Sequence, residues 1–135
     1  MKVDGQCHCG AIMYEADVEP GTIAICNCND CQRQSGSAFR TNIQTSAENF
    51  RIIKGSPTTY IKTADSGARR THAFCGTCGS PIYACAAEDP KTYSLRLGAL
   101  NQKHLLGAPA RQIWTKRRFA WLDELNIVPG VAGQP

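Results

Sequence analysis

The chain has 135 residues, of which 42% are hydrophobic and 19% are charged. This length suits one hydrophobic core, and the composition excludes global disorder, so we expect a single domain over residues 1–128 and a loose tail over 129–135. The formal net charge is +4, and no apolar run reaches the roughly 18 residues of a membrane span. We therefore expect no membrane partner.

The N-terminus lacks the apolar core of a signal peptide, so we expect a cytoplasmic protein with free or metal-bound thiols rather than disulfides. The only dense basic run is Lys116–Arg118, next to Trp114, Phe119 and Trp121. Basic residues between aromatics can follow a nucleic-acid backbone. Three charges are also typical of a solvated strand edge or loop, which is the interpretation that we favour.

In chain order, the sequence reads mainly as short strands separated by Gly, Pro, Asp and Ser turns. We expect a helical turn or loop at Asn29–Ser35, a one-turn helix at Thr45–Glu48 with a Ser cap, and a short terminal helix at Ala120–Leu125. The expected strands are Ile12–Ala16, Thr22–Ile25, Ala38–Ile43, Phe50–Lys54, Thr58–Lys62, Arg70–Phe74, Pro81–Ala86, Thr92–Gly98 and Gln112–Trp114.

Seven of the eight cysteines lie in three short-spaced groups: Cys7 and Cys9; Cys26, Cys28 and Cys31; Cys75 and Cys78. A zinc ion needs four protein ligands to be fully enclosed and three if one position stays open. The count of seven thiols fits one site of each kind. The third group is typical of a zinc-knuckle turn, because its glycines allow a positive φ and a close approach of backbone N–H to sulfur.

Cys7 and Cys9 stand at alternate positions, so on an extended chain their side chains point the same way. They can then share one zinc ion with Cys75 and Cys78. We expect this site to be structural, because zinc binding contributes roughly 10 kcal/mol or more to the folding of small zinc peptides.

Cys26, Cys28 and Cys31 leave the fourth position of a second zinc ion unassigned. Water, a substrate sulfur or a protein group can fill it, the protein candidates being His8, His72, His104 and Cys85. We favour an open position, since Cys85 reads as a small buried hydrophobe and each histidine as a surface or turn residue. With both ions bound, the two sites carry −2 and −1, which lowers the net charge of +4 to about +1.

The order CxCG, then CxCxxCQRQSGSAF, then FCGTCGSPIY resembles the glutathione-dependent formaldehyde-activating family. The resemblance runs from Val3 to Leu125 and implies a mainly β, Mss4-like fold: packed antiparallel sheets stabilised by zinc, with few short helices. It also implies a structural zinc on the first and third cysteine groups and a catalytic zinc on the middle group. One departure is Asn27, where the family often has His; that position is not a ligand.

An open zinc position can bind a thiol, lower its pKa and hold the thiolate beside a carbonyl, and attack then gives a hemithioacetal. The resemblance implies glutathione as the thiol and formaldehyde or a larger aldehyde as its partner, hence a carbon–sulfur lyase. Glutathione carries two carboxylates, and Arg33 and Arg40 are the cations nearest to the middle group in sequence. The competing hypothesis is a non-catalytic zinc module that binds a protein or nucleic acid through its β surface.

Overall fold

The computed structural model describes residues 1–135 as ten strands, one α-helix and five 3-10 helices. The strands are β1 (Lys2–Gln6), β2 (Met13–Asp17), β3 (Ala24–Cys26), β4 (Arg40–Ser46), β5 (Phe50–Lys54), β6 (Thr58–Thr63), β7 (Arg69–Phe74), β8 (Pro81–Ala86), β9 (Thr92–Arg96) and β10 (Arg111–Ile113). The helices are α1 (Asn29–Ser35) and the 3-10 helices η1 (Ala47–Asn49), η2 (Leu97–Ala99), η3 (Lys103–Leu105), η4 (Thr115–Arg117) and η5 (Ala120–Ile127).

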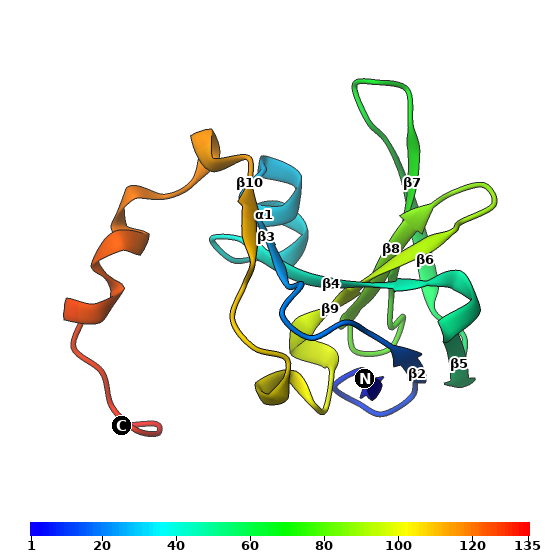
Figure 1. Ribbon diagram of the computed structural model, residues 1–135, viewed down its shortest axis with the longest axis horizontal. Helices are drawn as coiled ribbons and strands as arrows, with labels where there is room; N and C mark the ends of the chain where they lie inside the picture. The colour runs from blue at the N-terminus through cyan, green and yellow to red at the C-terminus, as the bar shows by residue number, and fades with distance from the viewer.

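The strands form two sheets (Figure 1). One has three strands in the order β1-β2-β5, and the other has seven in the order β10-β3-β4-β9-β8-β7-β6. All neighbouring strands are antiparallel except β10 and β3, which are parallel. The expected mainly β fold is therefore confirmed, with the larger sheet mixed rather than purely antiparallel.

An aromatic cluster joins the two sheets. Phe50 of β5 lies with its ring centroid 5.7 Å from Tyr14 of β2, 5.2 Å from Tyr83 of β8 and 4.6 Å from Tyr93 of β9. These tilted and edge-on contacts are the arrangements that aromatic rings prefer. Gly5 of β1 stands directly opposite Tyr14, and its missing side chain leaves the space that the tyrosine ring occupies.

The seven-stranded sheet has one apolar and one polar face, because successive side chains in a strand point to opposite sides. Ile43 and Leu95 are paired across β4 and β9, and both are fully buried. The register puts a different set of side chains on the opposite side, which we call the polar face: Cys26, Arg40, Asn42, Tyr60, His72 and Arg96.

The C-terminal part differs from the expected pattern. Lys116 and Arg117, expected on a solvated strand edge or loop, belong to the 3-10 helix η4 and are exposed as expected. The terminal helix is also of the 3-10 type and extends to Ile127. In Figure 1 this segment, coloured orange to red, runs beside the sheets and away from them. No helix in the structure is both long and apolar enough to cross a membrane.

Candidate metal centres

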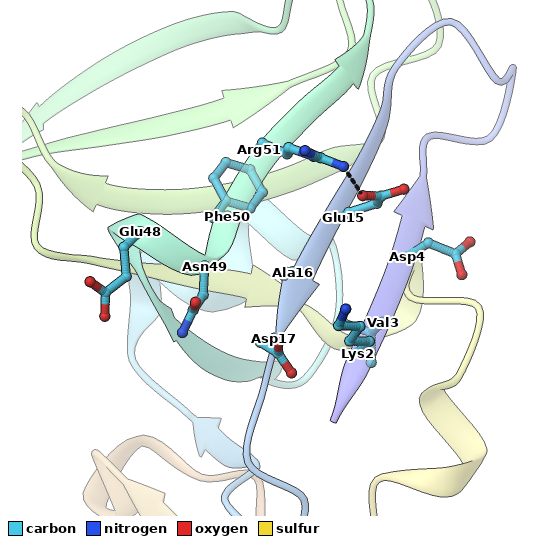
Figure 2. Close-up of a pocket in the computed structure, with 10 residues that line it drawn as sticks. All are labelled: Lys2, Val3, Asp4, Glu15, Ala16, Asp17, Glu48, Asn49, Phe50 and Arg51. Atoms are coloured by element: carbon cyan, nitrogen blue, oxygen red, sulfur yellow. Dashed lines mark hydrogen bonds and ion pairs between the residues drawn. The ribbon is translucent and has the colours of Figure 1, made fainter.

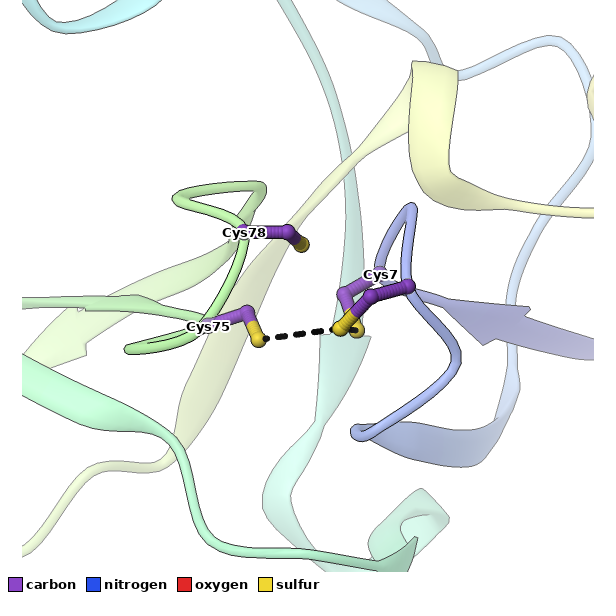
Figure 3. A group of neighbouring side chains, drawn as sticks. Cys7, Cys75 and Cys78 are labelled. Atoms are coloured by element: carbon purple, nitrogen blue, oxygen red, sulfur yellow. Dashed lines mark hydrogen bonds between the residues drawn. The ribbon is translucent and has the colours of Figure 1, made fainter.

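The first and third cysteine groups meet in space. Cys7 and Cys9 lie in the turn that follows β1, and Cys75 and Cys78 lie in the turn between β7 and β8. All four Sγ atoms lie within 4.8 Å of one another. Figure 3 shows the two turns facing each other, with the thiols directed into the space between them. This group, the four-cysteine cluster, connects the N-terminal strand to the middle of the chain.

Each turn is closed by a backbone hydrogen bond from a glycine, which stands three residues after Cys7 in one turn and four residues after Cys75 in the other. The N–H of Gly79 donates to the carbonyl of Cys75 at 2.8 Å, and the N–H of Gly10 donates to the carbonyl of Cys7 at 3.1 Å. The two glycines have φ values of 77° and 76°, which non-glycine residues rarely adopt. The extended conformation expected for Cys7 and Cys9 is therefore wrong, because a turn closed by Gly10 brings the two thiols together.

The spacing of these thiols fits zinc. Cys9 Sγ lies 3.6 Å from Cys7 Sγ and 3.7 Å from Cys75 Sγ. A tetrahedron with zinc–sulfur bonds of about 2.3 Å has sulfur atoms about 3.8 Å apart. The backbone N–H of Ile12 donates to Cys7 Sγ at 3.2 Å, and a hydrogen bond with Ser80 lowers the pKa of the Cys78 thiol to about 5. Both interactions favour the thiolate form that metal binding requires.

The middle group, the three-cysteine cluster, is built at the junction of β3 and α1. Cys26 is the last residue of β3, and Cys28 is the N-cap of α1, where its Sγ accepts the N–H of Cys31 at 3.4 Å. The three Sγ atoms lie within 4.8 Å of one another. A hydrogen bond from Cys31, with further help from the backbone of Cys28 and the charge of Arg40, lowers the pKa of Cys26 to about 5.

No histidine, carboxylate or further cysteine joins this group. His8 and His104 are exposed, and His8 belongs to the turn of the other cluster. Cys85 is buried on β8, opposite Tyr93, so the register places it on the apolar face, away from Cys26. His72 is on the polar face, where its Nδ1 lies 3.3 Å from Nη2 of Arg96.

The loop that carries the three-cysteine cluster is anchored by the C-terminal segment. Asn27 is fully buried, and both its backbone N–H and its Nδ2 donate to the carbonyl of Ile113 in β10 at 3.1 Å. Gln32 of α1 donates to the carbonyl of Arg117 at 3.1 Å. In the sequence, Asn27 was notable only as a departure from the family pattern. In the structure, its hydrogen bonds connect the end of β3 to the parallel strand β10.

A cavity of about 410 Å³ opens on the polar face. Arg40 is directly opposite Cys26 in the β3–β4 pair, while Arg33 is exposed on α1. The lining residues are Gln34, Arg40, Tyr60, His72, Ala73, Phe74, Gly79, Pro81 and Arg96. Sequence reasoning missed Arg96, for which the available signal was an arginine between two leucines in an expected strand.

Two ionisable side chains of this cavity are strongly affected by burial. Burial lowers the pKa of His72 to about 4, and the charge of Arg96 acts in the same direction. Because an arginine can only donate, Nδ1 of His72 is the acceptor, and the ring hydrogen is assigned to Nε2. Burial also lowers the pKa of Arg96 to about 9, so at neutral pH a neutral imidazole faces a charged guanidinium.

A larger cavity, of about 590 Å³, lies on the three-stranded sheet and is lined by no cysteine (Figure 2). Its walls carry charges of both signs, and Arg51 of β5 pairs with Glu15 of the neighbouring strand β2 at 2.7 Å. The smaller cavity is not lined by a cysteine either, but it adjoins the three-cysteine cluster through Arg40, which lines it and is opposite Cys26.

The fold and the clusters together define a class: a mainly β protein with two thiol sites, of four and three cysteines, that could each bind a metal ion. The sequence pattern of one family, described as glutathione-dependent formaldehyde-activating enzyme, matches residues 2–117. The chain belongs to this family. It also resembles the crystal structure of a Rhodobacter sphaeroides protein, with a TM-score of 0.62 and 22% identity over 81% of this chain and 98% of that one. At that identity the likeness establishes the fold alone.

Proposed function

We propose that the protein is a zinc-dependent carbon–sulfur lyase that adds a thiol, such as glutathione, reversibly to formaldehyde or another aldehyde. In this proposal the four-cysteine cluster binds a structural zinc ion, and Cys26, Cys28 and Cys31 bind a catalytic one. Family membership suggests this chemistry. The observation that best supports the proposal is the three-cysteine cluster, in which three thiols lie together without a fourth protein ligand.

Cys26, Cys28 and Cys31 would hold the zinc ion, which would supply a Lewis-acidic position that lowers the pKa of a bound thiol toward neutral. The addition forms one bond, between the thiol sulfur and the carbonyl carbon, and the proton that leaves sulfur ends on the carbonyl oxygen. The chain provides the positioning: α1 and β3 fix the three cysteines, and the cavity beside Arg40 accommodates the carbonyl compound. His72 can donate its Nε2 hydrogen to an oxygen in this cavity.

Exchange spectroscopy tests the activity directly. Zinc-loaded protein is added to an equilibrium mixture of glutathione and formaldehyde, and the rate of exchange between free and thiol-bound formaldehyde is measured by NMR. We expect faster exchange with the wild type than in buffer, and no acceleration with Cys28→Ser. Cys85→Ser is the matched control, because Cys85 is a lone thiol on the apolar face. Equal rates for the wild type and Cys28→Ser would refute the proposal.

Zinc stoichiometry separates this proposal from a non-catalytic zinc module. The enzyme hypothesis requires two zinc ions per chain, one of which is readily removed by a chelator or competed by glutathione. One tight zinc ion, or two inert ones, would favour the module instead.

A further inference from the structure

Two arginines in the wall of the 410 Å³ cavity are almost fully buried. The exposed fraction is 5% for Arg40 and 7% for Arg96. Buried arginines are rare unless a partner compensates their charge. Arg51 and Arg69, which are exposed, and Arg118, which is partly buried, form ion pairs with carboxylates, whereas the two buried arginines form none.

The protein partners of the buried arginines are neutral. Arg40 donates from Nη2 to Gln34 Oε1 at 3.1 Å. Arg96 donates from Nη1 to Asn42 Oδ1 and from Nη2 to His72 Nδ1. A guanidinium has five N–H donors, so most of the donors of this pair have no partner in the protein. The Nε atoms of both arginines are buried without any hydrogen bond.

The register brings the two arginines together beside the three-cysteine cluster. Arg40 is opposite Cys26, and Asn42, two residues further along β4, is opposite Arg96. Two positive charges are thus fixed on one face of the sheet, next to the position where the proposed reaction takes place.

We propose that Arg40 and Arg96 form a carboxylate-binding site, so that one reaction partner, the thiol or the carbonyl compound, carries a carboxylate that these arginines bind. This inference rests on the proposed function for the identity of the two partners. Planar, forked guanidinium groups suit a carboxylate better than any other small anion except phosphate. Formaldehyde itself has no charge and offers nothing for this pair to bind.

The alternative is that the arginines only balance the negative charge of the three thiolates. In that case neutral and anionic substrates of equal size would bind equally well. The two explanations therefore differ in one measurable quantity, the preference for a carboxylate over a neutral group at the same position.

The experiment uses zinc-loaded full-length protein and two matched pairs of probes. For the thiol, 3-mercaptopropionate is compared with 3-mercaptopropanol by calorimetric titration. For the carbonyl compound, glyoxylate is compared with glycolaldehyde in the exchange assay, with one fixed thiol. We expect the wild type to prefer the carboxylate at least about tenfold in one of the two arms, as for a charge-assisted pair of hydrogen bonds. That arm identifies the partner which carries the carboxylate.

Arg96→Gln should abolish the preference for the carboxylate probe. Arg96→Lys should retain only part of it, because an ammonium group cannot form the paired hydrogen bonds of a guanidinium. Arg51→Gln, on the three-stranded sheet, should leave the preference unchanged. A direct readout on the wild type does not depend on these variants folding: the arginine Nε–H resonances should shift on addition of the preferred carboxylate and not of its neutral analogue. No preference in either arm together with unshifted resonances would overturn the inference. A carboxylate-specific shift without thiol addition would support the binding site and refute the proposed function.

Discussion

The four-cysteine cluster should contribute far more to stability than the three-cysteine cluster. It cross-links Cys9 and Cys75, which are 66 positions apart, and so connects the β1–β2 turn to the β7–β8 turn. The three-cysteine cluster closes only the short loop from Cys26 to Cys31. The test compares the double variant Cys75→Ser/Cys78→Ser with the single variant Cys28→Ser.

The magnitude follows from loop closure. A cross-link across 66 residues removes about 4 kcal/mol of chain entropy from the unfolded state, against about 2 kcal/mol for the loop from Cys26 to Cys31. Because domains of this size have total stabilities of about 5–15 kcal/mol, the double variant should lose a large fraction of its stability. Cys28→Ser should fold, since serine is itself a preferred N-cap for α1.

Urea unfolding followed by circular dichroism, with zinc content measured by mass spectrometry, provides the assay. We expect the double variant to lose at least about 4 kcal/mol and one zinc ion per chain. Cys28→Ser should lose no more than about 2 kcal/mol. Equal losses for the two variants would refute the division into a structural and a reactive site.

Two further variants test the packing and the polar face. Gly5→Ala should lower the free energy of unfolding in urea by about 1–3 kcal/mol, because the added Cβ would lie 2.3 Å from Cζ of Tyr14. The control is Gly133→Ala, at a position with open space around it. An unchanged unfolding midpoint for Gly5→Ala would contradict the packing of Tyr14 against Gly5. His72 has a folded pKa of about 4 against about 6.5 unfolded, so the unfolded state binds more protons below pH 6.5. Wild-type stability should therefore fall by up to about 3 kcal/mol between pH 6.5 and pH 4. His72→Gln should lack this component in unfolding curves across that range, whereas a variant of the exposed His104, His104→Gln, should keep it. Identical pH profiles for the wild type and His72→Gln would exclude a lowered pKa for the half-buried imidazole of His72.

The local features of this protein could be predicted from its sequence. Cysteine spacing identified both clusters, because ligands two or three residues apart reach one ion whatever the rest of the chain does. Most strands were also predicted, since their turns are marked by Gly, Pro and Ser. The segment Asn29–Ser35, expected to be a helical turn or loop, is the helix α1. Strand β1 was missed because Lys2–Gln6 contains one apolar side chain and a glycine, and its place in the sheet depends on pairing with β2.

The buried arginines could not be predicted, because their burial depends on pairing between distant strands. Arg96 reads in sequence like any exposed strand residue between two leucines. It lies in the cavity only because β9 pairs with β4 in a register that sets it opposite Asn42, more than fifty residues away. Arg40 was identified by its nearness to the cysteines in sequence, and Arg33 by the same criterion, yet only Arg40 is buried beside them.

The same register that builds the core also builds the polar face. Ile43 is fully buried on the apolar face of β4, and a shift of β4 by one residue would turn it toward the polar face and move Arg40 into the core. Burying a guanidinium there without a partner would cost several kcal/mol, so the alternative register is strongly disfavoured. The apolar residues that stabilise the sheet therefore also fix Arg40 opposite Cys26, which means that core substitutions at Ile43 should disturb the three-cysteine cluster without touching it.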